Sequence, residues 1–179
     1  NTTGTQNVAV GTQAGESITT GANNISIGYL AMNAETTGSG AVAIGTNALV
    51  SQNGSGTTSY NVGVGHWAGK SITTGLKNTL MGGLAGDELT TGGSNVIIGY
   101  LSGSSGTNLT TGTGNVLLGS DADASASDSD YANVIGYDVT GAGGYTTLGK
   151  SGDDIRAAHG TATWATVSDE RYKKDIVDS

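Results

Sequence analysis

The chain has 179 residues and a formal net charge of −8 at pH 7, with 32 glycines and no proline, cysteine or phenylalanine. Its nine aromatic residues (seven Tyr and two Trp) are too few to fill the core of an ordinary globule of this length. The composition excludes disulfides and thiolate metal sites. It also argues against nucleic-acid binding, because Lys70 and Lys77 are the only cations before Lys150.

No apolar run approaches the ~20 residues that a membrane-spanning helix needs, so we expect no membrane insertion. No secretory signal is visible. The chain opens on Asn1 in the middle of a repeating pattern and without a methionine. We therefore expect it to be an excerpt of a longer polypeptide.

A five-residue motif organises the chain from residue 7 to residue 136. Its first copy, Asn7-Val8-Ala9-Val10-Gly11, combines alternating apolar residues with a closing glycine. The closing glycines follow one another at steps of 17, 17, 20, 17, 17, 20 and 17 residues. Repetition at a fixed step predicts a solenoid, in which each unit buries its apolar side against its neighbours. The copies lie at residues 7–11, 24–28, 41–45, 61–65, 78–82, 95–99 and 115–119, with a decayed copy at 133–136.

Each copy predicts a short β-strand. The apolar residues before the glycine alternate, as Val8 and Val10 do, which indicates a strand with those residues facing inward. The residue between them is small in the early copies and apolar in the later ones. Later strands should therefore be apolar on both faces and need a second layer or a second chain to cover them. The apolar intervening residues are Leu80, Ile97 and Leu117.

The segments between the strands predict tight corners. A small residue follows each strand, and a Thr-Thr-Gly sequence, as at residues 19–21 and 73–75, precedes most later strands. The 17, 17 and 20 steps form a larger unit of 54 residues, so the insertions at residues 52–59 and 102–108 should project as loops along one side. After a polar, acidic segment at 120–130, residues 145–149 predict one last strand.

The strand copies resemble the head repeats of trimeric autotransporter adhesins. The resemblance rests on Asn-Val-Ala-Val-Gly at residues 7–11 and Ala-Val-Ala-Ile-Gly at 41–45, each followed three positions later by Ala14 or Ala48. Those heads are parallel β-rolls in which three chains pack side by side. We therefore expect an all-β, parallel β-solenoid or β-roll of 17- and 20-residue repeats, assembled as an elongated homotrimer.

A second resemblance concerns the end of the chain. Residues 167–176, Val-Ser-Asp-Glu-Arg-Tyr-Lys-Lys-Asp-Ile, resemble the opening of the endosialidase-type intramolecular chaperone that ends many bacteriophage tail fibres and tailspikes. That domain helps three chains to fold together and then cuts itself off before the serine of its Ser-Asp motif. The resemblance implies cleavage between Val167 and Ser168, with Ser168 and Lys173 as the participating residues. A serine needs an adjacent base of this kind to act as a nucleophile.

These resemblances divide the chain into a β-repeat shaft or tip region (1–149), a connecting segment (150–167) and the beginning of a chaperone (168–179). They imply a structural and host-attachment protein of a phage tail fibre or tailspike, located in the virion. Its partners would be two identical chains and a bacterial surface receptor. The alternative is the head of a bacterial trimeric adhesin at the cell surface. Apart from single-turnover self-cleavage in the full-length precursor, we expect no enzymatic activity.

Aromatic residues follow several of the strand-closing glycines. If the strands stack in register, Tyr29, Trp67, Tyr100 and Tyr137 lie along one edge, where aromatic faces can stack on the sugar rings of a surface glycan. The competing interpretation is that these side chains cover corners or fill the seam between three chains.

Other functions have weaker support in the sequence. Carboxylates at Asp121, Asp123, Asp128 and Asp130 suit calcium, but the glycine-punctuated loop of known calcium motifs is missing, so a solvated acidic loop and no metal site are expected. No cofactor is expected. A polysaccharide-degrading tailspike would need convergent carboxylates, whereas those here are scattered. Ice binding needs outward threonines spaced as T-x-T, whereas adjacent threonines point to opposite faces.

Overall fold

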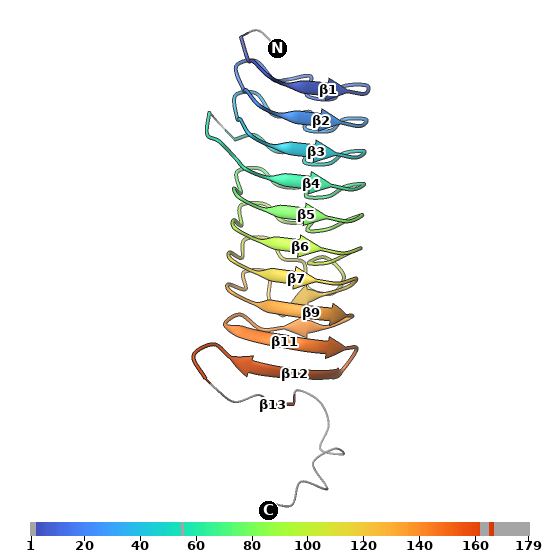
Figure 1. Cartoon of the computed structure of the whole chain (residues 1–179), viewed down its shortest axis with the longest axis vertical. Coiled ribbons are helices and arrows are strands. Elements are labelled where there is room, and N and C mark those ends of the chain that lie inside the picture. The colour runs from blue at the N-terminus through green and yellow to red at the C-terminus, as the bar shows by residue number, and fades with distance from the viewer. Residues whose placement is uncertain (1–2, 55, 162–164, 167–179) are drawn as a thin grey trace, which may run out of the picture.

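The computed structural model describes residues 3–54, 56–161 and 165–166. It shows an all-β chain wound into a parallel β-solenoid of about 8 turns, with coils of about 17 residues. Figure 1 shows the coils stacked along one axis, with β1 near one end and β12 near the other. The predicted all-β parallel β-solenoid and its repeat step are confirmed, and the homotrimer stays a prediction.

In the described residues, each coil contributes one strand to a continuous parallel sheet, in chain order and in register. Ile25, for example, is paired with Val8 on one side and with Val42 on the other. The parallel strands are β1 (Val8–Val10), β2 (Ile25–Ile27), β3 (Val42–Ile44), β4 (Val62–Val64), β5 (Thr79–Met81), β6 (Val96–Ile98), β7 (Val116–Leu118), β9 (Asn133–Tyr137) and β11 (Tyr145–Lys150).

The sheet changes direction after β11, which is the predicted last parallel strand. β12 (Asp153–Ala158) pairs antiparallel with β11, and β13 (Ala165–Thr166) pairs antiparallel with β12. The sheet thus continues across residue 150. A separate two-stranded parallel sheet joins β8 (Asp123–Ala124) to β10 (Thr140–Gly141).

In β2 to β7 the middle residue of each strand is buried inside the solenoid, whereas all three residues of β1, in the first coil, are exposed. Ser26, Ala43 and Leu80 are fully buried, whereas Ile25 and Ile27 are partly exposed. The expectation that the flanking valines and isoleucines face inward is therefore wrong. A coil of this size is narrow and leaves room for one side chain per strand, which the early coils fill with serine, alanine or glycine.

Large and small residues compensate one another across this narrow interior. A Cβ atom on Gly63 would lie 2.7 Å from Cγ of Leu49, and a Cβ atom on Gly69 would lie 2.5 Å from Cδ1 of Leu80. Early coils thus carry the large side chain at the corner, and later coils carry it on the strand. Later strands do have apolar residues on both faces, but the face left outside is formed by the flanking residues in every coil.

A column of buried asparagines connects successive coils. Nδ2 of Asn78 donates to the carbonyl of Gly92 (3.0 Å), and its Oδ1 accepts from the backbone N–H of Asn95 (3.0 Å). Each side chain satisfies backbone groups 14 and 17 residues ahead, or 17 and 20 residues ahead for Asn95, which precedes the second insertion. The column therefore holds each corner and the next strand in register. Equivalent bonds are made by Asn24, Asn61, Asn95 and Asn115.

The first insertion compensates for an alanine that interrupts the asparagine column in the third coil. Oε1 of Gln52 accepts from Nδ2 of Asn61 (2.9 Å), and its Nε2 donates to the carboxylate of Glu35 (3.1 Å). Glu35 is fully buried and also accepts from the N–H groups of Gly38 (2.6 Å) and Gly54 (2.9 Å). A buried carboxylate therefore ties the inserted loop to the preceding coil.

The glycine that closes each strand is required by its conformation and by the closeness of the next coil. From Gly11 to Gly136 these glycines have φ between +123° and +149°. A Cβ atom on Gly82 would lie 2.5 Å from the carbonyl oxygen of Gly99. Only glycine accommodates both constraints.

Candidate functional site

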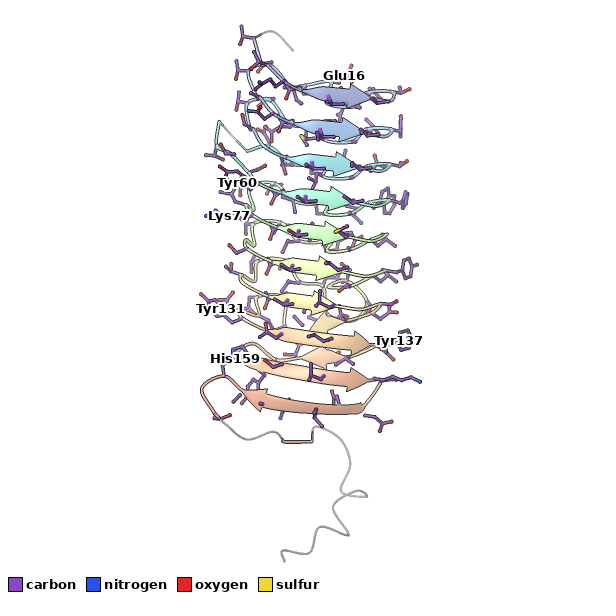
Figure 2. All side chains as sticks on the ribbon, in the orientation of Figure 1. Glu16, Tyr60, Lys77, Tyr131, Tyr137 and His159 are labelled. Carbon is purple, nitrogen blue, oxygen red and sulfur yellow. The ribbon has the colours of Figure 1, made fainter. Side chains whose placement is uncertain are left out.

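The first and third residues of the strands form an apolar surface, which we call the outer sheet face. In β1 to β7 its residues are valine, isoleucine, leucine, methionine and one threonine, with no charged side chain. Their side chains stand on the strands in Figure 2. The most exposed residues of β1 to β7 are Val10 (56%), Val8 (47%), Met81 (41%), Ile44 (37%) and Ile98 (37%), and Ile135 of β9 is 43% exposed.

The outer sheet face is comparable in size to the largest apolar patches on monomeric proteins. Three residues per strand and the seven strands β1 to β7 give a footprint of roughly 10 by 30 Å, or about 300 Å². The largest apolar patch on a typical monomeric protein covers about 300–600 Å² and often marks a binding site. The outer sheet face is therefore the strongest candidate in the described residues for contact with another protein surface.

A second surface follows the strand-closing glycines, and we call it the aromatic edge. It consists of the residues directly after those glycines at which an aromatic ring stands: Tyr29, His66, Tyr100 and Tyr137. All four are exposed. Figure 2 shows Tyr137 projecting from the side of the stack at the ends of the strands.

Backbone hydrogen bonds fix the register of this edge. The carbonyl of Tyr29 accepts from the N–H of Asn47 (2.9 Å) in the next coil, and the carbonyl of Tyr100 accepts from the N–H of Asp121 (3.0 Å). The expected stacking of Tyr29, Tyr100 and Tyr137 at one edge thus agrees with their positions. Whether they bind a ligand stays a prediction.

Trp67 is placed differently from the three tyrosines. It lies one residue further along, its backbone is left-handed (φ +61°), and its indole stacks on the ring of His66 (centroids 4.9 Å apart, interplanar angle 16°). Nζ of Lys70 lies 4.8 Å from the indole centroid. Both neighbours cover the indole, so the ring that occupies the edge position in this coil is His66. The sequence shows His66 directly after its glycine, which is the signal that identifies it.

Lys70 is itself held by two carboxylates of the next coil. Its Nζ lies 2.8 Å from Asp87 and 3.0 Å from Glu88, and the hydrogen bond with Asp87 is the main cause that raises the pKa of Lys70. The Trp67 and Lys70 pair thus forms part of a contact between coils. This arrangement favours a structural role for Trp67.

The opposite edge of the sheet carries a separate set of exposed side chains. Figure 2 shows Tyr60, Lys77 and Tyr131 on the side of the stack that lies away from Tyr137. A Cβ atom on Gly114 would lie 2.8 Å from the ring of Tyr131, so this ring covers the backbone of the preceding coil. Because this edge also carries exposed tyrosines, Tyr131 provides a control for experiments on the aromatic edge.

The acidic segment contains one buried carboxylate with a structural role. Asp123 is 2% exposed, and it accepts from Oγ of Ser105 (2.7 Å) and from the N–H of Gly106 (2.5 Å). Burial raises the pKa of Asp123, and the hydrogen bonds from Ser105 and Gly106 oppose that shift. Asp123 thus ties down the second insertion as Glu35 ties down the first. In the described part of the chain, no three His, Asp or Glu residues are grouped so that they could hold a metal ion.

The residues predicted for self-cleavage, Ser168 and Lys173, lie outside the described residues. Among the residues that the structure describes, no helix is long and apolar enough to span a membrane.

Comparison of the chain with protein-family models, with curated proteins and with solved structures finds no significant match. The candidate sites therefore depend on the geometry described above.

Proposed function

We propose that the chain is a rod-shaped segment of a bacteriophage tail fibre or tailspike, and that three copies associate through the outer sheet face. The rod spaces or presents a surface to a receptor on a bacterial envelope. The observation that carries this proposal is the uncharged apolar face that runs along β1 to β7 of an elongated solenoid. Such a face is unfavourable in water and favourable between chains.

Identical copies are suitable partners for this face. Every chain repeats the same strand spacing along its length, so strands of neighbouring chains can meet at matching heights. A footprint of about 300 Å² is less than half of the roughly 800 Å² per partner that stable interfaces bury. Three chains around an axis allow each chain to contact two neighbours with the face and its flanks, which enlarges the buried area. A parallel assembly of this kind also folds slowly, which explains the use of a terminal chaperone.

The association is tested by placing a charge on the outer sheet face. Ile98→Lys introduces an ammonium group on β6, where a second chain would bury it. Thr111→Lys adds the same group at an exposed corner outside the strands. In sedimentation equilibrium, the wild type and Thr111→Lys should have three times the mass of one chain, and Ile98→Lys should dissociate. A trimer that survives Ile98→Lys would show that the chains associate through another surface.

We further propose that maturation cleaves the precursor before Ser168, with assistance from Lys173. The test is expression of the chain with its natural continuation, followed by intact mass measurement. The wild-type precursor should be cut between Val167 and Ser168, and Ser168→Ala should remain whole. An uncut wild-type precursor with a folded continuation would contradict the maturation step and leave the rod proposal standing.

The receptor surface that we propose is the aromatic edge, with Tyr29, Tyr100 and Tyr137 as contacts. Trp67 supports it by positioning His66. Replacing the three tyrosines with alanine should weaken adherence of the labelled rod to cells that bind the wild type. Tyr131→Ala, on the opposite edge, is the control. Unchanged adherence would reject the edge as the contact surface.

The alternative is the head of a bacterial trimeric adhesin, which the likeness of the strand copies at residues 7–11 and 41–45 favours. Both candidates share the trimeric rod. They differ in the domain on the C-terminal side of the rod: a folded, cleavable chaperone supports the phage protein, and a coiled-coil stalk with a membrane anchor supports the adhesin.

A further inference from the structure

The rings on the aromatic edge are spaced regularly along the solenoid. Tyr29 follows β2, His66 follows β4, Tyr100 follows β6 and Tyr137 is the last residue of β9, the eighth parallel strand in the stack. An aromatic ring therefore occurs at every second coil. The other coils carry small residues at the same position: Thr12 lies before the first ring, and Thr46, Gly83 and Ser120 lie between successive rings.

Because the strands are hydrogen-bonded in register, the alternation fixes the distance between successive rings. Parallel strands lie about 4.8 Å apart, so rings two coils apart recur at about 9.6 Å, and the four rings span about 29 Å. Tyr29, Tyr100 and Tyr137 are 50%, 56% and 54% exposed, so each leaves ring surface for a ligand. The ring of Tyr100 reaches back toward the preceding coil: a Cβ atom on Gly83 would lie in ordinary van der Waals contact with it, at 3.5 Å.

A period of two units at this distance is a property of a particular kind of polymer. In an extended β-1,4-linked polysaccharide each sugar is rotated by half a turn relative to the one before, so the same ring face recurs at every second sugar. A row of aromatic rings on one side of such a chain would stack on alternate sugars. The hydroxyl groups of Thr46 and Ser120 lie at intervening heights, where sugar hydroxyls need hydrogen-bond partners. Oγ of Ser120 already donates to the carboxylate of Asp121 (2.8 Å), so it is available to a sugar as an acceptor.

The charge near the aromatic edge indicates whether an acidic or an uncharged polysaccharide can bind there. The chain carries a net charge of −8, and Asp121 and Asp138 lie directly after the edge positions of their coils. Lys70, whose Nζ lies over the indole of Trp67, is already paired with Asp87 and Glu88. Lys150, the in-register partner of Tyr137, is outnumbered by Asp121 and Asp138. An acidic polysaccharide would be repelled by this surface, whereas an uncharged one would not.

We propose that the aromatic edge binds an uncharged, extended β-1,4-linked polysaccharide that runs parallel to the solenoid axis, with alternate sugars stacked on Tyr29, His66, Tyr100 and Tyr137. This inference rests on the proposed attachment function and specifies the class of receptor. It also explains why the rings are absent from every other coil, since a ring at an intervening height would meet the sugar that presents its opposite face.

The first test measures how affinity depends on length. The probes are β-1,4-linked N-acetylglucosamine oligomers of three, five and seven sugars, with α-1,4-linked glucose oligomers of the same lengths as controls, in isothermal titration calorimetry. Each added pair of sugars reaches one more ring, so affinity should rise about three- to tenfold per step. The curved α-linked oligomers should bind weakly at every length. Equal binding of both series, or binding of neither, would overturn the inference.

The second test moves one ring without changing the composition. The double variant Gly83→Tyr with Tyr100→Gly transfers the ring by one coil. Gly83 accepts a side chain because its φ is not positive and because a Cβ atom there would meet only the ring of Tyr100, which the variant removes. In the double variant, affinity should no longer rise between the oligomers of three and seven sugars. In Tyr131→Ala, affinity should rise with length as in the wild type. Tyr29→Ala breaks the row at an independent position and should reduce affinity for the heptamer about three- to tenfold. An unchanged length dependence in the double variant would show that the spacing is not recognised.

Sedimentation equilibrium of the same variants separates this inference from the function on which it rests. If Tyr29→Ala or the double variant dissociates the trimer, the rings belong to the seam between chains and the glycan inference fails. If the trimer stays intact and adheres to cells but binds no β-1,4-linked oligomer, the glycan class is wrong and the attachment function stands. If the wild type itself is monomeric, the proposed function fails first.

Discussion

Replacement of Asn78 by alanine tests the asparagine column, on which the register of the coils depends. Asn78 is fully buried, and its side chain makes hydrogen bonds to the carbonyl of Gly92 and the N–H of Asn95. It also contacts the amide groups of Asn61 and Asn95. In Asn78→Ala those two neighbouring side chains keep other partners, because Asn61 still accepts from the N–H of residue 78 and Asn95 still donates to Gly112.

The cost therefore comes from two buried backbone groups, the carbonyl of Gly92 and the N–H of Asn95. An unsatisfied buried group of this kind costs about 1–3 kcal/mol, so the free energy of unfolding should fall by about 2–6 kcal/mol per chain. This exceeds the ~1 kcal/mol of an ordinary hydrogen bond, because both partners remain in the fold without replacement.

The assay is guanidinium unfolding followed by far-ultraviolet circular dichroism at one fixed protein concentration, since assembly makes stability depend on concentration. Asn108→Ala, at an exposed position in the second insertion, is the matched control and should change stability by less than about 0.5 kcal/mol. If Asn78→Ala lowered the free energy of unfolding no more than Asn108→Ala does, the asparagine column would not be what satisfies these backbone groups.

Three further changes test other parts of the account. Gly82→Ala should destabilise the fold by more than about 3 kcal/mol, because φ is positive there and the methyl group would collide with the next coil. Gly83→Ala, which meets neither constraint, should be nearly neutral. Similar melting temperatures of the two variants would show that the strand-closing glycine is not required. Glu35→Ala should destabilise by at least about 2 kcal/mol and speed amide exchange at Gly54, whereas unchanged exchange would show that the carboxylate does not hold the loop. The raised pKa of Asp123 means that its ionised form lowers stability at neutral pH, and that this loss is relieved as pH falls through the folded pKa toward the unfolded value of about 3.9. Relative to Asp123→Asn, the wild type should therefore gain melting temperature between pH 7 and pH 4, and a constant difference would refute the assignment.

The repeat step was enough to predict the solenoid, the strand positions and the parallel register. The predicted copy at residues 24–28, for example, contains the strand Ile25–Ile27. The inward face was predicted wrongly, because a period of two separates two faces without saying which one is inside. The decisive clue was size: a narrow coil needs small residues such as Ser26 and Ala43 inside, and both were visible in the sequence.

The aromatic edge was predictable in outline for the same reason, since equal spacing places Tyr29 and Tyr100 at equivalent positions. The environment of Trp67 was not, because its indole is covered by Lys70 and His66, and Lys70 is held by Asp87 from the next coil. Such contacts depend on rotamers and on charge pairs between coils, which a repeat pattern does not specify. The trimer and the cleavage before Ser168 stay predictions.

The claim on which the function depends is that the outer sheet face is covered by two further copies of the chain. Sedimentation equilibrium of the purified protein over a range of micromolar concentrations tests it most directly. The account predicts one species of three times the 17.6 kDa chain mass, dissociated by Ile98→Lys. A folded monomer with the outer sheet face exposed to water at all those concentrations would contradict it.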